Sequence, residues 1–228
     1  MCGRYTLFAS AEMLADRFGV DAPDDHSPRY NCAPGQSLPV VPDDSNKMTR
    51  MEWGLVPEWA DDNSSAQINA RGETVAEKPT FRDAFERRRC LVPADGFYEW
   101  VAGHNGKQPH RVAFADNRPF AMAGLWTRWT PQTAQTGLTE FGGGGPDEPE
   151  PQETFAVVTT EPNDLVAELH HRMAVVLSPG EEETWLHGDV DEAQALLNPY
   201  PDDEMTVHKV STRVNDVSND GAELIEPV

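Results

Sequence analysis

The stretch Arg89-Cys90-Leu91-Val92-Pro93-Ala94-Asp95-Gly96-Phe97-Tyr98-Glu99-Trp100-Val101 carries the strongest fold signal in this sequence. Its β-branched and aromatic residues predict two strands, 90–93 and 96–101, around a turn at Ala94-Asp95-Gly96. Similar apolar runs predict further strands at residues 38–41, 48–53, 110–115, 120–126, 155–160, 173–177 and 205–210. The pattern therefore favours an α+β fold built on a curved, mostly antiparallel, barrel-like β-sheet with short flanking helices.

Short helices are expected between these strands. Ser10 is a typical N-cap for a helix over 11–18, which would place Met13, Leu14 and Phe18 on its inner face. Thr80-Phe81-Arg82-Asp83 resembles a capping box and predicts a helix through Glu86. Further helical turns are predicted at 163–169, from Ser178-Pro179-Gly180-Glu181 onward and at 191–197, whereas 21–29 is expected to be a polar loop.

The length of 228 residues fits a single domain, because no linker divides the chain into two apolar halves. Residues 131–153 contain four consecutive glycines followed by an acidic, proline-rich run. Such a composition buries too little apolar area to order itself. We expect a flexible loop inside the domain at this place.

The composition excludes global disorder but not nucleic-acid binding. Hydrophobic residues make up 38% of the chain, with six Trp and nine Phe, which is enough for a core. The 39 Asp and Glu residues against 18 Lys and Arg give a net charge of −21. Such a surface repels polyanions unless its cations gather in one patch. We interpret the acidity as a device for solvation, and the run Arg87-Arg88-Arg89 fits either a helix C-terminus or a DNA-facing role.

The cysteine count argues against a disulfide framework. Cys2, Cys32 and Cys90 are odd in number and lack the CxxC spacing of a zinc site, so a reducing cytoplasm fits best and no metal or cofactor is expected. No apolar run approaches the ~20 residues of a membrane span. No feature of the sequence indicates a particular protein partner.

Cys2 is the residue with the most distinctive chemistry. If Met1 is removed, which the small side chain of Cys2 favours, Cys2 carries an α-amine beside its thiol. The amine can form a Schiff base with an aldehyde, and the thiol can close onto the imine carbon to give a five-membered thiazolidine. Both groups titrate near physiological pH, with ordinary pKa values of about 8 for the amine and about 8.5 for the thiol. The alternative is an ordinary small residue in a frayed terminus.

Three further polar residues interrupt apolar strand patterns. Asn69 follows Ile68 directly, Glu99 lies among aromatic residues, and His170 precedes an apolar strand. A carboxylate among aromatics should be desolvated and have a raised pKa, which suits proton transfer, and a histidine with a pKa near about 6.5 can serve the same purpose. Taken singly, Asn69 fits a turn residue, Glu99 an outward strand position and His170 a core histidine.

The order of motifs along the chain resembles the SOS response-associated peptidase (SRAP) family. The resemblance spans essentially the whole chain and rests on these motifs: Met1-Cys2-Gly3-Arg4-Tyr5, Tyr30-Asn31-x-Ala33-Pro34, Trp53-Gly54-Leu55-Val56-Pro57, Asn69-Ala70-Arg71-x-Glu73-Thr74, residues 89–100 with position 95 variable, Ala123-Gly124-Leu125-Trp126 and His170-x-Arg172-Met173.

The resemblance implies action on abasic sites in single-stranded DNA, with Cys2 as the nucleophile that forms a thiazolidine with the open-chain sugar and shields the lesion. It implies that Asn69 orients Cys2, that Glu99 is the acid/base beside it, and that His170 assists ring opening and reversal of the crosslink. Lyase-like chemistry and a cytoplasmic, nucleoid-associated location are further implications. The implied DNA contacts are Arg4, Arg71 and Arg172, with weaker assignments at Trp59, Trp100 and Thr159.

Two alternatives stay open. A Cys2-dependent peptidase, including one that processes its own Met1, would use the thiol but not the α-amine. A non-covalent adaptor for single-stranded DNA would stack bases without forming a bond. Two features depart from the family pattern: Ala174 stands where the family commonly has Pro, and the acidic charge is unlike that of a typical DNA binder.

Overall fold

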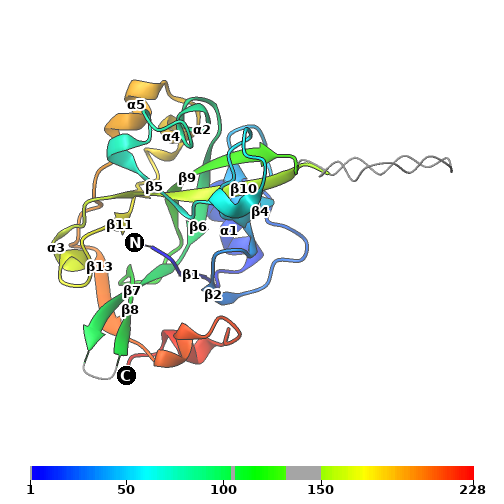
Figure 1. Cartoon of the computed structure of the whole chain (residues 1–228). Helices are drawn as coiled ribbons and strands as arrows, with labels where there is room; N and C mark the ends of the chain where they lie inside the picture. Colours follow the sequence, from blue (N-terminus) through cyan, green and yellow to red (C-terminus); the bar gives the residue numbers. More distant parts are fainter. Residues whose placement is uncertain (1, 104–105, 132–149) are drawn as a thin grey trace.

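The computed structural model describes residues 2–103, 106–131 and 150–228 and has an α+β fold with two β-sheets (Figure 1). The strands are β1 Tyr5–Leu7, β2 Arg29–Cys32, β3 Ser37–Pro42, β4 Thr49–Trp53, β5 Asn69–Arg71, β6 Arg89–Ala94, β7 Gly96–Gly103, β8 Gly106–Phe114, β9 Phe120–Trp129, β10 Gln152–Thr160, β11 Met173–Ala174, β12 Val176–Leu177 and β13 Met205–Lys209. The α-helices are α1 Ala11–Phe18, α2 Arg82–Arg87, α3 Asp164–Ala167, α4 Glu182–His187 and α5 Val190–Ala195. Short 3-10 helices are η1 Asn63–Ser65, η2 Gly72–Thr74, η3 Thr212–Asn215 and η4 Ala222–Ile225.

The larger sheet closes into a barrel. Its strands pair in the order β10-β4-β3-β6-β9, and β9 pairs back onto β10, so that the ring has no free edge. All pairs in the ring are antiparallel except β10 with β4. The barrel-like core predicted from the strand pattern is therefore confirmed.

The second sheet holds the N-terminal strand at its interior. Its order is β13-β8-β7-β1-β2, and every pairing is antiparallel. Strand β1 pairs with β2 through Tyr5 and Cys32 and with β7 through Tyr5 and Phe97. The segment ahead of β1 is thus fixed on two sides, and the C-terminal η3 and η4 pack beside β8 and β2 (Figure 1).

The stretch 89–101 connects the two sheets. Strand β6 lies in the barrel, whereas β7 lies in the five-stranded sheet, with Asp95 between them. The fully buried Asp95 carboxylate accepts hydrogen bonds from the Thr6 hydroxyl at 2.6 Å and from the backbone N–H groups of Phe8 at 2.6 Å and Ala9 at 3.0 Å. A Cβ at Gly96 would lie 2.7 Å from the Arg111 Nε, so a larger residue here would displace a guanidinium that is held by the Asp95 carbonyl and the Asn117 side chain.

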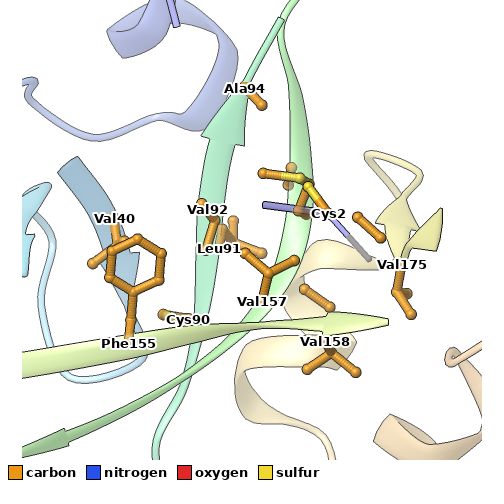
Figure 2. Packing of buried hydrophobic residues seen from close by; sticks show 14 of the residues in the cluster. Cys2, Val40, Cys90, Leu91, Val92, Ala94, Phe155, Val157, Val158 and Val175 are labelled. Carbon is orange, nitrogen blue, oxygen red and sulfur yellow. The ribbon is translucent and has the colours of Figure 1, made fainter. Parts of the chain in front are cut away.

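The core fills the barrel and the space between the sheets. Figure 2 shows side chains of β6 and β10 packed together, with Cys2 and Val175 beside them. Trp53, Phe155 and Trp185 are among the largest fully buried side chains. Burial of this apolar surface is the main stabilising contribution to the fold.

Several local predictions are wrong. Met13 is 50% exposed, because the inner face of α1 is narrower than the sequence pattern indicates and buries only Leu14 fully. Helix α2 begins at Arg82 with Phe81 as its N-cap and no side-chain cap, so the predicted capping box at Thr80 does not form. A capping box does form at Asp189 and Glu192 of α5.

Strand boundaries also differ from expectation. Arg29–Cys32 is a strand where a polar loop was predicted to lead into a turn, and 173–177 is two short strands, β11 and β12, that pair with β10 and β9 respectively. Strand β10 begins at Gln152, inside the predicted flexible loop, because Gln152 and Glu153 pair with β9. The rest of that loop, 132–149, lies outside the described residues.

Two of the three arginines in the run 87–89 make contacts within the fold. Arg89 is buried and donates to the backbone carbonyls of Phe85, Trp185 and Gly188. Arg88 forms an ion pair with Glu58. Of the two interpretations of this run, the structural one applies to Arg89 and Arg88.

Candidate functional site

Cys2 is part of the core and not a frayed terminus. It lies three positions ahead of the interior strand β1 and is fully buried, at 0% exposure, beside β6 and Val175 (Figure 2). Burial, with a further contribution from the charge of Glu99, raises the pKa of the Cys2 thiol to about 12. The thiol is therefore protonated at neutral pH, and the Glu99 carboxyl is close enough to influence it electrostatically.

Asn69 holds the backbone of Cys2. It is the first residue of β5, which runs parallel to β10 with Asn69 opposite Val157. Its side-chain Nδ2 donates to the Cys2 carbonyl at 2.9 Å, while its buried Oδ1 has no hydrogen-bond partner among the described residues. An amide in this position can fix the Cys2 main chain and still accept a hydrogen bond from a nearby amine.

Glu99 is buried in β7, opposite His110 of β8, and only 2% of it is exposed. Desolvation raises the pKa of its carboxyl from 4.5 to about 7. The raised pKa expected for a carboxylate among aromatics is confirmed, and the outward strand position is excluded. A carboxyl group with this pKa can both donate and accept a proton near neutrality.

His170 is partly exposed and follows the short helix α3. Its Nδ1 accepts a hydrogen bond from the Arg172 backbone N–H at 3.1 Å, and its ring stacks on His171 with centroids 4.3 Å apart. Burial, with smaller contributions from neighbouring positive groups including Lys107, lowers the pKa of His170. The same Nδ1 also lies 3.3 Å from the Arg172 carbonyl oxygen, so the ring can pair with the Arg172 backbone as an acceptor when neutral and as a donor when protonated.

Glu99 and His170 line one cavity of about 350 Å³ together with Arg4, Trp100, Lys107 and Asn215. The structure thus brings together four residues that the sequence singled out, and Cys2, which Asn69 holds, lies within electrostatic range of Glu99. Sequence reasoning missed Lys107 and Asn215. Lys107 is one of only four lysines in the chain, but nothing in the sequence distinguishes Asn215 from other polar residues of the tail.

The three arginines of the prediction differ in their surroundings. Arg4 lines the cavity and donates from Nη1 to the Asn31 side chain and to the Val214 carbonyl, both at 2.7 Å. Arg71 is exposed and has no hydrogen bond or ion pair to any described residue. Arg172 is 9% exposed and forms an ion pair with Glu73, so it is largely committed to the fold.

The three residues with weaker predicted DNA contacts also differ in their surroundings. Trp59 is 62% exposed, and Trp100 lines the cavity with its indole N–H donated to Asn215 at 2.7 Å. Thr159 is fully buried, donates to the Ala70 carbonyl at 3.3 Å and accepts a bond from Arg172 at 3.2 Å. We therefore do not retain Thr159 as a direct DNA contact, because its hydroxyl stabilises the position of Arg172 from within.

Metal and membrane features are limited to two observations. Within residues 2–103, 106–131 and 150–228, no three His, Cys, Asp or Glu side chains form a group that could hold a metal ion. No helix in the described part of the chain has the length and apolar character needed to cross a membrane.

Comparison with known proteins gives a consistent result. The family model described as SOS response associated peptidase (SRAP) matches residues 1–217. The abasic site processing protein YoqW of Bacillus subtilis is 38% identical over 99% of both chains, and YedK of Escherichia coli, which carries the same description, is 32% identical over 100% of both. The abasic site processing protein HMCES of Gallus gallus is 32% identical over 89% of this chain and 67% of its own.

The fold comparison agrees. A crystal structure of a Bacteroides thetaiotaomicron protein superposes with a TM-score of 0.84, covering 100% of both chains at 25% identity. The sequence comparisons and the fold comparison thus agree over nearly the whole chain. This chain belongs to the SOS response-associated peptidase (SRAP) family.

Proposed function

We propose that the protein processes abasic sites in DNA by capturing the lesion's aldehyde covalently through Cys2, once Met1 has been removed. The observation that carries this proposal is the position of Cys2, which is held by Asn69 and lies close to Glu99, beside a cavity that also contains His170 and Arg4. The relatives named abasic site processing proteins support the substrate class. The captured strand would be shielded from scission while the damage is dealt with.

The proposed reaction releases one water. The α-amine of Cys2 attacks the aldehyde carbon to form a carbinolamine, which loses water to give an imine. The Cys2 sulfur then bonds to the imine carbon, and its proton passes to the nitrogen, which closes the thiazolidine. The protonated Glu99 carboxyl can assist the departure of water, and its carboxylate can then take the thiol proton, since a pKa of about 7 allows both forms.

His170 has a separate part in this scheme. The abasic sugar must open from its furanose ring before it presents an aldehyde. As its imidazolium, His170 can give a proton to the ring oxygen while the bond to the anomeric carbon breaks, and the anomeric hydroxyl, which becomes the aldehyde oxygen, gives up its proton to water. In the reverse direction the neutral ring takes the proton back from the sugar hydroxyl as the furanose closes, which gives His170 a role in release of the adduct.

Single-stranded DNA suits this surface better than a duplex. The exposed indole of Trp59 and the ring of Trp100 at the cavity offer faces on which unpaired bases could stack. Arg71 is exposed on β5 and forms no ion pair with a described residue, although its charge acts on Glu73, so its guanidinium can contact a phosphate. Arg4 and Arg172 would act mainly by shaping the site, since both are already bonded within the fold.

The two alternatives are less well supported. A cysteine peptidase needs a thiolate beside an imidazole, whereas burial and the charge of Glu99 raise the pKa of the Cys2 thiol to about 12. A non-covalent adaptor would not need a buried Cys and a buried Glu close together, with an Asn that holds the Cys in place. Both remain distinguishable outcomes of the test below.

The test uses the intact protein and a single-stranded oligonucleotide with one abasic site. We expect a heat-stable band of lower mobility on a denaturing gel, with a mass equal to protein without Met1 plus DNA minus one water. The same oligonucleotide with a reduced, alcohol-bearing abasic site is the control and should give no band. Absence of a band with the aldehyde substrate would contradict covalent capture and leave the adaptor, whereas peptide cleavage would favour the peptidase.

Replacing Glu99 with glutamine should slow capture and stabilise the fold at the same time. We expect the single-turnover rate to fall by about 100-fold and to lose its inflection near the Glu99 pKa of about 7. Because the carboxyl pKa is raised from 4.5, its contribution to stability is present below pH 4.5 and is lost as the pH rises through about 7.

A neutral amide in place of the Glu99 carboxyl avoids that loss. Glu99→Gln should therefore be more stable than the parent protein by up to ~3 kcal/mol at about pH 8 and no more stable at about pH 4. Urea unfolding at the two pH values measures this, with the exposed Glu52→Gln as control. Equal stability of Glu99→Gln and the parent protein at the higher pH would contradict a desolvated carboxyl.

A further inference from the structure

The wall of the cavity is mostly made of groups that bind one another. The Trp100 indole is fixed by Asn215 at 2.7 Å, and the Arg4 guanidinium carbon lies 5.8 Å from the centre of the Trp100 ring. Arg4 is also tied to Val214 and Asn31. These contacts make the wall rigid, and they leave Arg4 little freedom to follow a ligand.

Lys107 is the exception among the lining residues. It lies opposite Ala102 near the end of the β7–β8 hairpin, and because Trp100 lies opposite Pro109, register puts Lys107 and Trp100 on the same face. The Lys107 side chain is exposed and forms no hydrogen bond or ion pair with any described residue. Its positive charge acts on His170, which agrees with its place at the same cavity.

Lys107 shares this uncommitted state with Lys47, Lys78 and Lys209, none of which forms an ion pair with a described residue, but of these lysines it is Lys107 that lines the cavity. Most arginines are neutralised locally by an acidic side chain: Arg17, Arg29, Arg50, Arg82, Arg88, Arg111, Arg118, Arg128, Arg172 and Arg213. Among the described residues that line the cavity, the cations are Arg4 and Lys107, and neither has an acidic partner. A net charge of −21 repels DNA at long range, so a free cation at the cavity has a large local effect.

We propose that Lys107 binds a backbone phosphate of the single strand, next to the sugar that occupies the cavity; the identity of the strand rests on the proposed function. An abasic nucleotide has lost its base but keeps the phosphates on both sides of its sugar. A sugar beside Glu99 and His170 would carry one of them to the rim of the cavity. The ammonium group of lysine, on a flexible stem, binds phosphate as a point charge without a demanding geometry.

The test measures binding of a fluorescein-labelled oligo-dT strand without any abasic site, by anisotropy over a range of salt concentrations. For Lys107→Ala we expect weaker binding at low salt and a slope of log K against log salt that is shallower by about 0.7, the value for one phosphate contact on a single strand. Lys107→Arg should retain the parent slope. Lys47→Ala, which removes an exposed lysine from a different cavity, is the matched control and should also retain it.

A second measurement separates binding from chemistry. At saturating abasic DNA, Lys107→Arg, which keeps the positive charge beside His170, should form the adduct at the parent rate. Two results would overturn the phosphate contact. The first is an unchanged salt slope in Lys107→Ala. The second is a lower rate of adduct formation by Lys107→Ala at saturating DNA that Lys107→Arg does not restore, because the amine would then act in the reaction. Failure of the proposed function is recognised separately, as absence of adduct in the parent protein, since oligo-dT binding does not involve Cys2.

Discussion

Replacing Cys2 with serine is expected to abolish the heat-stable adduct with abasic single-stranded DNA but to leave a Schiff base that a hydride donor can trap. Serine keeps the α-amine once Met1 is removed, so the imine can still form. Its hydroxyl is a much weaker nucleophile toward the imine carbon than sulfur, so the ring does not close and the imine hydrolyses on denaturation. Cyanoborohydride reduces the imine to a stable secondary amine and should restore the band on the gel.

A second variant separates the amine from the thiol. Inserting Gly-Ser between Met1 and Cys2 keeps the sulfur but moves the free amine to another residue, so we expect no thiazolidine. Cys32→Ala, which removes a different buried thiol, should retain the adduct. Adduct formation by Cys2→Ser without hydride, or by the extended variant at the parent rate, would assign the nucleophile to another group.

The prediction depends on the environment of Cys2 as much as on its chemistry. A cysteine in a mobile terminus would react with any aldehyde it met. Here the thiol is buried with a pKa raised to about 12 and the Cys2 carbonyl is held by Asn69. Reactivity should therefore require a substrate that enters the cavity beside Glu99 and His170. Abasic DNA should react faster than a small aldehyde at equal concentration, which a competition with glyoxylate would measure on the same gel.

Strand patterns in the sequence predict most of the β-structure but not its assembly. Alternation and β-propensity identify the two runs on either side of Asp95 as strands. They contain no information on partners, and β6 and β7 in fact belong to different sheets. Strand β2 escaped prediction because Arg29, Tyr30 and Asn31 have little apolar character, whereas their pairing depends on β1 and on the distant Asp220, which accepts from the backbone of Tyr30 and Asn31.

The sequence predicts those residues of the candidate site whose type and motif indicate a chemical role. Cys2, Asn69, Glu99 and His170 were identified from residue type and family order, and the structure brings them to one region. The roles of Arg172 and Thr159 could not be read from the sequence, because an ion pair with Glu73 and a buried hydroxyl depend on tertiary contacts. Lys107 and Asn215 join the cavity only through the pairing of β7 with β8 and the packing of η3, which no local signal records.

Removing the Asp95 carboxylate should give the largest loss of stability among the substitutions considered. Asp95 accepts bonds from Thr6, Phe8 and Ala9, and Arg111 donates to its backbone carbonyl at 2.6 Å. Burial raises the pKa of Asp95, while these hydrogen bonds and the charge of Arg111 oppose the rise. In Asp95→Ala the buried donors lose their acceptor and Arg111 loses its only nearby acid among the described residues. We expect the free energy of unfolding to fall by about 3–5 kcal/mol.

Urea unfolding followed by tryptophan fluorescence measures this loss, with Asp116→Ala as the matched control. Asp116 is an exposed carboxylate paired with Arg118, and its removal should change stability by less than about 1 kcal/mol. Because the bonds of Asp95 hold the chain that follows β1, capture should also slow in Asp95→Ala under conditions where it remains folded, whereas Asp116→Ala should capture at the parent rate. Equal unfolding midpoints for the two variants would contradict the role of Asp95 as the joint between the sheets. A loss of stability without any change in capture would instead mean that Cys2 keeps its position through Asn69 and the flanking strands alone.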